Sequence, residues 1–458
     1  MYQIDFAKPI HVHFIGIGGI SMSGLAEVLL DRGFTVSGSD SKETNLTLHL
    51  KDLGAKVDIG QKAENITEGI DIVVYTAAIS NDNEELCRAK ELNIPCMSRA
   101  VLLGQIMKNY EIPIAVSGTH GKTTTTSMIS EILMKADLDP TLSIGGILPS
   151  IRGNIRIGAS DIFVTEACEY TNSFHSFFPK ISIILNVDAD HLDFFKDIDE
   201  IRASFKKFAE ILPQDGTLIV NGEIPNLPEI IKDLTCNVIT FGSNSTYDYY
   251  SENVTYDSFA RPTYTICHKG EKRDVTLGVT GSHNVMNALS AVALSDLLDI
   301  PFDIVKAALS EFTGTDRRFQ KKGEVDGVTI IDDYAHHPTE IQATLKAAHN
   351  YPHKKLWCVF QPHTYTRTKA LLPEFAEALS LADHVVLADI YAAREKNTIG
   401  ITSKDLQNEI IKNGGTCDYF PSFDEIQNFL QKNYSPGDLL ITMGAGDIVK
   451  VGENLLIN

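Results

Sequence analysis

The chain has 458 residues, and at roughly 150 residues per domain this length predicts about three domains. A hydrophobic content of 43% and a charged content of 22% are ordinary for a soluble globular protein. Sixty acidic residues against forty basic ones give a formal net charge of −20, which argues against nucleic acid and anionic membranes as partners, because both bind basic faces.

The cysteines and the apolar runs indicate the cellular compartment in which we expect the protein. Seven cysteines are scattered without a C-x-x-C pair, which disfavours a disulfide framework and indicates reducing surroundings. No apolar run approaches the ~20 residues of a membrane helix, and the first residues lack the features of a signal peptide. We therefore expect a cytoplasmic protein without stable membrane association. We expect it to be a monomer or a homodimer.

The first predicted elements cover residues 1–110 and are typical of a Rossmann-like domain. A strand at 11–18 enters a glycine turn and a helix, a second strand at 34–40 ends on Asp40, and a third lies at 71–78. Gly16 and Gly18 fit the dinucleotide fingerprint, but its third glycine falls on Ser21. A nicotinamide-dependent dehydrogenase and a plain tight turn are therefore both open interpretations of this segment.

Residues 111–316 predict a second domain with a parallel sheet. Strands at 112–117, 161–166 and 181–186 alternate with helical patterns at 124–136 and 284–298. Residues 240–280 are rich in Tyr, Ser and Thr with alternating polarity, which predicts a small antiparallel patch at the edge of this domain.

The segment 116–126, VSGTHGKTTTT, follows the first of these strands. The usual phosphate-loop spacing requires a glycine at 116, where this chain has Val116. A glycine turn that merely begins a helix is the alternative. Glu166 at the end of the next strand argues for a nucleotide site, because the carboxyl ends of parallel strands meet at one edge. There Lys122 can reach phosphates, while Thr123 and Glu166 offer the oxygen ligands that Mg²⁺ prefers.

Residues 317–458 predict a third domain, again Rossmann-like. Its expected strands lie at 328–334, 356–361, 384–390 and 438–444. The neighbouring His336 and His337 do not predict a metal site, because adjacent residues on an extended chain point opposite ways. Arg367 is a better candidate, because a guanidinium can neutralise charge on a transferring phosphoryl group. The expected fold is thus α/β with three domains, the middle one resembling a P-loop ATPase.

Eight motifs in order across nearly the whole chain carry a resemblance to a known family. They are HFIGIGGISMSGLA, SGTHGKTTTT, TEACEY, NVDADHLD, GSHNVMNALSA, GTDRRF, DDYAHHPTEI and QPHTYTRT. With these motifs the chain resembles the Mur ligases, ATP-dependent enzymes that form amide bonds in peptidoglycan assembly. In that family the loop has the form G-T-H-G-K-T and does not require the earlier glycine. The resemblance therefore implies that Val116 is compatible with a phosphate-binding loop.

The resemblance implies an activity. ATP and Mg²⁺ would convert the carboxylate of UDP-N-acetylmuramate to an acyl phosphate, and the amine of L-alanine would displace phosphate from it. Three alternatives stay open: a ligase that joins a preformed murein peptide to the same sugar, a ligase for folate or another acid, and a non-catalytic nucleotide-binding regulator. The intact lysine and magnesium positions argue against the last.

The resemblance also implies roles for residues. Lys122 would contact the β- and γ-phosphates, Arg367 would clamp the γ-phosphate, and His191 would hold a second Mg²⁺ beside the one on Thr123 and Glu166. His336 and Tyr334 would lie near the amino acid. The nucleotide would also meet Gly118, Thr119, His120, Gly121, Thr124, His283 and Asn287. The uridine diphosphate would be bordered by Gly16, Gly18, Ser21, Thr76, Ala77 and Ala78.

Overall fold

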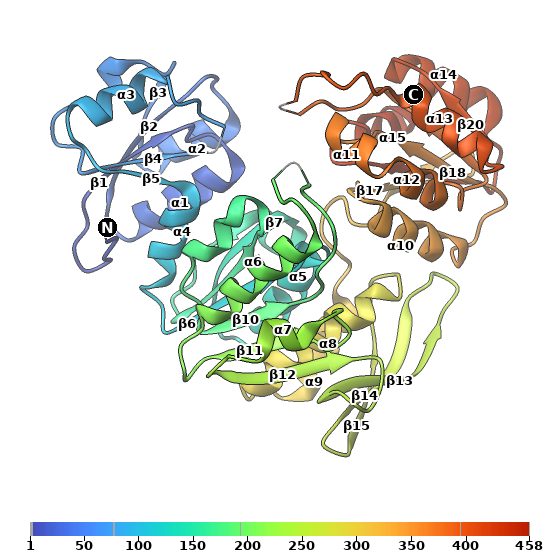
Figure 1. Ribbon diagram of the computed structural model, residues 1–458, viewed down its shortest axis with the longest axis horizontal. Helices are drawn as coiled ribbons and strands as arrows, with labels where there is room; N and C mark the ends of the chain where they lie inside the picture. The colour runs from blue at the N-terminus through green and yellow to red at the C-terminus, as the bar shows by residue number, and fades with distance from the viewer. Residues whose placement is uncertain (1–2, 77, 193, 394, 458) are drawn as a thin grey trace.

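The computed structural model describes residues 3–76, 78–192, 194–393 and 395–457. Three separate sheets build three domains, which Figure 1 shows as an N-terminal, a central and a C-terminal lobe. The α/β class with three domains is as predicted. No helix in the described part of the chain combines the length and the apolar character needed to cross a membrane.

The N-terminal domain has a five-stranded parallel sheet in the order β3-β2-β1-β4-β5. Its strands are β1 (His11–Ile15), β2 (Thr35–Asp40), β3 (Lys56–Ile59), β4 (Ile72–Tyr75) and β5 (Cys96–Ser98). Its helices are α1 (Ile20–Asp31), α2 (Asn45–Asp52), α3 (Glu84–Glu91) and α4 (Arg99–Met107), with a short turn η1 (Ala63–Asn65).

The central domain has a ten-stranded sheet in the order β15-β14-β13-β12-β11-β10-β6-β9-β7-β8. Its strands are β6 (Ile112–Ser117), β7 (Thr141–Leu148), β8 (Gly153–Arg156), β9 (Ile162–Ala167), β10 (Ile181–Ile184), β11 (Thr217–Asn221), β12 (Asn237–Gly242), β13 (Tyr249–Tyr256), β14 (Pro262–His268) and β15 (Glu271–Thr276). Strands β13 to β15 are antiparallel to one another at one edge, which confirms the predicted patch.

The helices of the central domain include two that build the site. They are α5 (Lys122–Lys135), α6 (Ile198–Glu210), α7 (Leu227–Ile231), α8 (His283–Leu297) and α9 (Phe302–Glu311), with the short turns η2 (Pro149–Ile151) and η3 (Tyr170–Ser176). Helices α5 and α8 pack against each other and share a buried core with β6, β9 and β10. The loop before α5 and the start of α8 therefore lie near each other.

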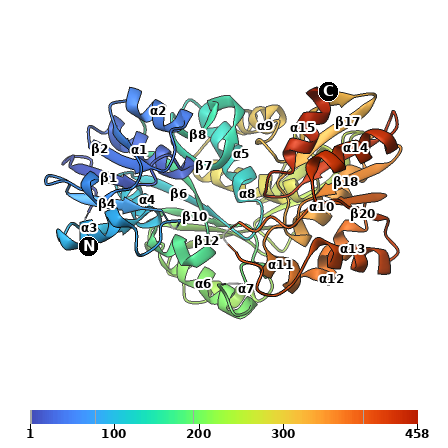
Figure 2. The same cartoon turned by 90° about the horizontal axis from the view of Figure 1, so that it is seen from above.

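The C-terminal domain has a six-stranded sheet in the order β16-β17-β21-β18-β19-β20. Its strands are β16 (Gln320–Val325), β17 (Val328–Asp333), β18 (Leu356–Phe360), β19 (His384–Leu387), β20 (Cys417–Tyr419) and β21 (Leu439–Met443). Its helices are α10 (Pro338–His349), α11 (Tyr365–Ala370), α12 (Leu372–Leu379), α13 (Ser403–Lys412), α14 (Phe423–Asn433) and α15 (Val449–Ile457). Seen from above, α10 and α11 face the central domain (Figure 2).

Candidate active site

The loop between β6 and α5 has the backbone of a phosphate-binding loop. Gly118 and Gly121 have φ values of +138° and +83°, which residues with a Cβ rarely adopt. A Cβ on Gly118 would also lie 2.9 Å from the Cβ of Leu185 on the neighbouring segment. Val116 lies one position before Ser117, the last residue of β6, and is fully buried in the core. A glycine at 116 is therefore unnecessary, because the turn begins after it.

Asn186, just beyond β10, fixes the loop from the side. Its Oδ1 accepts a hydrogen bond from the His120 N–H at 2.8 Å, and its Nδ2 donates to the His120 carbonyl at 3.0 Å. The Asp188 N–H donates to Thr119 Oγ1 at 2.9 Å. The loop and the segment after β10 are thus joined by backbone and side-chain hydrogen bonds, as expected for adjacent parallel strands that end at one edge.

Lys122 is paired with a carboxylate that the sequence did not single out. Its Nζ lies 3.0 Å from Glu169 Oε2 and donates to the Thr119 carbonyl at 3.1 Å. The Glu169 side chain is only 2% exposed. Burial alone would lower the pKa of Lys122, but the Glu169 carboxylate together with Cys168 and Glu166 raises it, so the ammonium stays charged. This cation is therefore available for exchange with a phosphate group.

Thr123 and Glu166 offer oxygen atoms to a cation. Thr123 Oγ1 lies 3.1 Å from Glu166 Oε2, while Glu166 Oε1 accepts a hydrogen bond from the Gly145 N–H. Two neighbouring ligands of an octahedral Mg²⁺ with bonds of 2.0–2.1 Å lie roughly 3 Å apart, so this pair fits the ion. A Cβ on Gly145 would lie 2.6 Å from the same carboxylate, so only glycine fits beside it.

The segment after β10 also brings His191 and Asp190 to this edge. His191 Nε2 lies 3.7 Å from Glu169 Oε1, and its ring lies 4.5 Å from that of Tyr170. Arg367, from α11 of the C-terminal domain, places Nε and Nη2 each 3.0 Å from Asp190 Oδ1. The Arg367 guanidinium lowers the pKa of Asp190 against the opposing effect of burial. The two domains are thus joined by an ion pair beside the loop.

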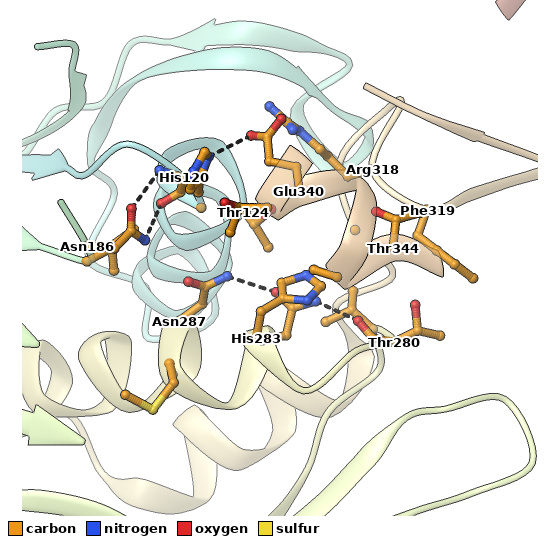
Figure 3. A pocket seen from close by; sticks show the side chains of 18 of the residues that line it. His120, Thr124, Asn186, Thr280, His283, Asn287, Arg318, Phe319, Glu340 and Thr344 are labelled. Atoms are coloured by element: carbon orange, nitrogen blue, oxygen red, sulfur yellow. Dashed lines mark hydrogen bonds and ion pairs between the residues drawn. The ribbon is translucent and has the colours of Figure 1, made fainter. Parts of the chain in front are cut away.

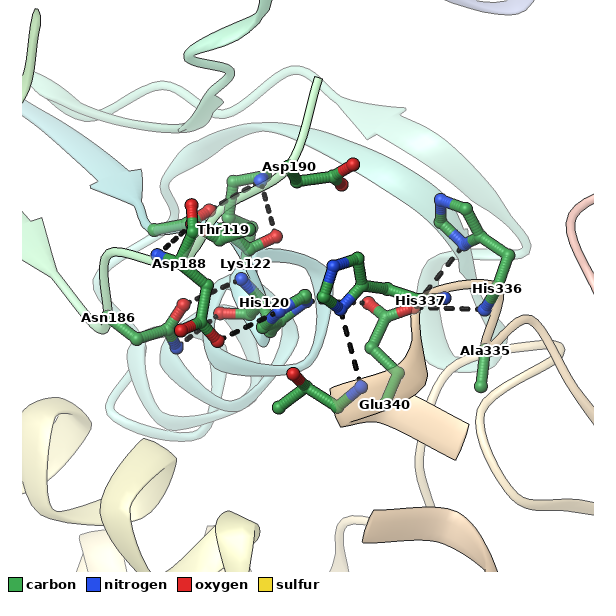
Figure 4. Close-up of polar contacts among 12 residues, drawn as sticks. Thr119, His120, Lys122, Asn186, Asp188, Asp190, Ala335, His336, His337 and Glu340 are labelled. Atoms are coloured by element: carbon green, nitrogen blue, oxygen red, sulfur yellow. Dashed lines mark hydrogen bonds and ion pairs between the residues drawn. The ribbon is translucent and has the colours of Figure 1, made fainter. Parts of the chain in front are cut away.

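A second junction between these domains centres on Glu340 of α10 (Figure 4). Its Oε1 lies 3.2 Å from His120 Nδ1, and its Oε2 accepts a hydrogen bond from the His336 N–H at 3.0 Å. His120 Nε2 lies 3.2 Å from Asp188 Oδ2 as an ion pair without hydrogen-bond alignment. Nearby, His337 Nε2 approaches the Ala189 carbonyl at 3.2 Å. One carboxylate therefore contacts both the loop and the predicted amino-acid region.

A cavity of about 330 Å³ opens between the loop, α8 and α10 (Figure 3). His120, Gly121 and Thr124 line it on one side and His283 and Asn287 on another. Its remaining polar lining includes Arg318, Asp333, Glu340 and Thr344. A cavity of this size, mostly apolar with a few polar groups, suits a nucleoside-sized ligand at the loop.

Several ionisable groups in this region stay neutral near pH 7. Burial lowers the pKa of His283, His336 and His363 to about 4 in each case. Burial also raises the pKa of Asp333 to about 6, so this carboxyl, unlike the three imidazoles, is still mostly charged at pH 7. The imidazoles of His283, His336 and His363 are therefore neutral hydrogen-bonding groups at neutral pH.

The remaining predicted residues form a separate set at the edge of the N-terminal sheet. Gly16 has a φ of +84°, and a Cβ there would lie 3.0 Å from Thr76. Ser21 lies in the first turn of α1, and Ala78 donates its N–H weakly to Thr76 Oγ1. Ala77 lies outside the described residues. This set belongs to a different sheet from the one that carries the phosphate loop.

Asp40 has a structural partner in the same turn. Its Oδ2 accepts a hydrogen bond from the Gly18 N–H at 2.8 Å, and a Cβ on Gly18 would lie 2.9 Å from that oxygen. The Asp40 carboxylate thus holds the glycine turn in place.

Comparison with known proteins agrees with this arrangement. The chain matches the models described as "Mur ligase family, catalytic domain" over residues 11–111, "Mur ligase middle domain" over 116–295 and "Mur ligase, glutamate ligase domain" over 317–446. It is 60% identical over 457 residues to a UDP-N-acetylmuramate–L-alanine ligase of Agathobacter rectalis, with 100% of both chains covered. The chain belongs to the Mur ligase family. The resemblance seen in the motifs is thereby confirmed.

Other Mur ligases show similar coverage. A UDP-N-acetylmuramate–L-alanine ligase of Lachnospira eligens is 59% identical over 458 residues, again with 100% of both chains covered. The crystal structure of UDP-N-acetylmuramate-alanine ligase from Thermotoga maritima superposes with a TM-score of 0.81 at 30% identity and covers 98% of each chain. The murein peptide ligase of Psychrobacter arcticus shares the fold, with a TM-score of 0.72 at 24% identity and 98% coverage of each chain.

Two site carboxylates of this Mur ligase were missed by sequence reasoning. Glu169 lies three residues beyond Glu166, past the end of β9, where strand-edge reasoning gives no signal. Glu340 did carry a signal, because HHPTE has the spacing of a helix start. The structure shows a capping box there, in which the Glu340 side chain reaches back to the N–H of His337.

Proposed function

We propose that the chain joins L-alanine to the lactyl carboxylate of UDP-N-acetylmuramate, with conversion of ATP to ADP and phosphate. The observation that carries the proposal is the end-to-end similarity to relatives named for this reaction. Because all seven cysteines are free thiols, we place the reaction in the reducing cytoplasm.

The reaction would proceed in two balanced steps. A carboxylate oxygen forms a bond to the γ-phosphorus of ATP while the bond to ADP breaks. The alanine nitrogen then bonds to the acyl carbon and loses a proton, and the carbon–oxygen bond to phosphate breaks. No covalent enzyme intermediate is needed, so the chain would act by positioning and by charge stabilisation.

The geometry suggests which residues serve each step. Lys122 would leave Glu169 for the β- and γ-phosphates, and Arg367 would add a second cation on the γ-phosphate. Thr123 and Glu166 would hold Mg²⁺, which supplies charge neutralisation when bound. His191 would serve a second ion, and Gly118, Thr119, His120, Gly121 and Thr124 would surround the phosphates and ribose.

The cavity suggests the place of the adenine. His283 and Asn287 line it at the start of α8. A neutral His283 can accept or donate a hydrogen bond to a base without adding charge. Tyr334 and His336 would border the alanine, because they lie next to Glu340 at the edge of the C-terminal sheet.

The N-terminal glycine turn would hold the uridine diphosphate. Gly16 and Gly18 lie between β1 and α1, and Ser21 lies in the first turn of α1, where backbone N–H groups can approach phosphate oxygens. Thr76, Ala77 and Ala78 would border the same group from the end of β4. We also propose domain limits of 1–110, 111–316 and 317–458, since the strands of the three sheets fall within 11–98, 112–276 and 320–443.

The test is phosphate release from ATP and Mg²⁺ by the wild-type chain and by Lys122→Ala. We expect release only when both UDP-N-acetylmuramate and L-alanine are present, and a loss of at least about 100-fold in the variant, because a transition-state cation is removed. Lys135→Ala is the control, because this lysine lies at the far end of α5 and pairs with Glu311. Release with a short peptide, but not with L-alanine, would contradict the proposal and favour a murein peptide ligase.

A further inference from the structure

Arg99 occupies a defined place beside the glycine turn of the N-terminal domain. Ile15 of β1, Tyr75 of β4 and Ser98 of β5 stand side by side in register. Gly16, Thr76 and Arg99 are therefore the residues that directly follow three adjacent strands. At roughly 4.8 Å between neighbouring strands, Ile15 and Ser98, which precede Gly16 and Arg99, lie about 10 Å apart. An arginine side chain can cover most of this distance.

The same residue also faces the central domain. Arg99 is the first residue of α4, and α4 packs against η3 of the central domain. The two elements lie so close that a Cβ on Gly104 of α4 would lie 1.9 Å from the carbonyl oxygen of Ser176 in η3. Burial raises the pKa of the Cys168 thiol, which lies between β9 and η3, whereas Lys122 and Arg99 both act to lower it. Arg99 and Lys122 are thus both close enough to Cys168 to interact with it electrostatically.

The guanidinium of Arg99 is partly buried without an anionic partner. Among the described residues it has neither a hydrogen bond nor an ion pair, whereas Arg367, Arg317 and Arg273 each pair with an aspartate. Burial lowers the pKa of Arg99. Withdrawing a cation from water without pairing it is costly, and a cation at the start of a helix is also disfavoured by the helix dipole. An anionic ligand would remove both costs.

We propose that Arg99 is a substrate-binding residue that pairs with an oxyanion of the sugar nucleotide. The inference rests on the proposed function, which places a diphosphate at the glycine turn and a carboxylate near Lys122. Both groups are planar or forked oxyanions that a guanidinium can bind through two N–H groups. Arg99 follows β5 near the glycine turn and interacts with Cys168, which also interacts with Lys122. The diphosphate and the lactyl carboxylate are therefore the two possible sources of that oxyanion.

The experiment measures dissociation constants for UDP-N-acetylmuramate, UDP-N-acetylglucosamine and UDP by titration calorimetry, with a non-hydrolysable ATP analogue present. Wild type is compared with Arg99→Ala, Arg99→Lys and the control Arg88→Ala, whose arginine is exposed on α3 and pairs with Glu91. We expect Arg99→Ala to weaken UDP-N-acetylmuramate by about tenfold or more, Arg99→Lys by less, and Arg88→Ala by less than about twofold.

The three ligands distinguish the two oxyanions. Equal weakening of all three would assign the diphosphate, and weakening of UDP-N-acetylmuramate alone would assign the carboxylate, which the other two lack. The affinity for the ATP analogue and the melting temperature of the free protein should not fall in Arg99→Ala, since the ligand-free guanidinium has no partner to lose. Unchanged affinity for UDP-N-acetylmuramate in Arg99→Ala would overturn the inference alone. Failure of the wild type to bind this ligand would overturn the proposed function as well.

Discussion

Replacement of Glu340 by glutamine tests the junction between the central and C-terminal domains. Burial acts to lower the pKa of His120, but the carboxylates of Asp188 and Glu340 raise it from 6.5 to about 9. The difference, 9 − 6.5 = 2.5 units, corresponds to roughly 3 kcal/mol of interaction with the charged imidazole. Asp188 and Glu340 lie at the same distance of 3.2 Å from the ring nitrogens.

The expected size of the effect follows from this symmetry. Each carboxylate supplies at least half of the net shift, because burial opposes both. Glu340→Gln should therefore lower the pKa of His120 by at least about 1 unit, or roughly 1.4 kcal/mol. Since the pKa in the folded protein is raised, this stabilisation is fully present below pH 6.5 and is lost as the pH rises through 9. The domain junction should weaken over that window in the wild type.

The assay is an NMR titration of the histidine side chains, with the His120 signal assigned by its loss in His120→Gln. Glu374→Gln is the matched control, because Glu374 is exposed on α12 of the same domain. A His120 pKa that stays near 9 in Glu340→Gln, or that falls equally in the control, would refute the reasoning. In that case Asp188 alone would hold the charge, and the contact with the C-terminal domain would contribute little.

Two further predictions concern buried contacts. Glu169→Gln should lower the free energy of unfolding by about 3 kcal/mol, because it leaves the Lys122 ammonium buried without its carboxylate. Chemical denaturation would measure this loss of stability. The control is Glu311→Gln, which breaks the more exposed pair with Lys135 and should cost less than about 1 kcal/mol. Equal losses in the two variants would contradict the importance given to the buried Lys122–Glu169 pair. Gly104→Ala should cost roughly 2–3 kcal/mol, because its Cβ would overlap the Ser176 carbonyl. Gly153→Ala is the control: a Cβ on Gly153 would have no atom nearer than 3.8 Å, so this variant should melt like the wild type. A normal melting temperature for Gly104→Ala would show that α4 can shift to make room for the added Cβ.

The strand-edge residues of the central domain could be predicted because their positions follow from topology. Parallel strands β10, β6 and β9 are neighbours, so Asn186, the loop and Glu166 must emerge at one edge. The antiparallel patch was also visible, because alternating polarity has the period of a strand. Family motifs added residues far apart in the chain, which local periodicity does not relate.

Contacts between domains could not be predicted in the same way. His120 and Glu340 are 220 residues apart, and no local pattern relates the loop to the start of α10. The pairing of Lys122 with Glu169 depends on the turn after β9, where Thr171 and Asn172 have positive φ values. Strand β16 was missed because its sequence, QKKGEV, is mostly polar, and it forms at the sheet edge by pairing with β17.

The two neighbours of the central domain are attached by different forces. A single apolar core extends from Val12 and Phe14 through Leu102 and Ile106 of α4 to Phe174 of η3, so the N-terminal and central domains share one hydrophobic interior. The apolar clusters of the C-terminal domain contain only its own residues. The contacts across that boundary include ion pairs and hydrogen bonds, together with the aromatic contact between Phe259 and Tyr351. Salt screens charges but hardly weakens apolar packing. Raising the ionic strength should therefore weaken the contact between the central and C-terminal domains more than the contact between the N-terminal and central domains. The first two domains would then move as one rigid unit, and the position of the third would depend on the salt concentration.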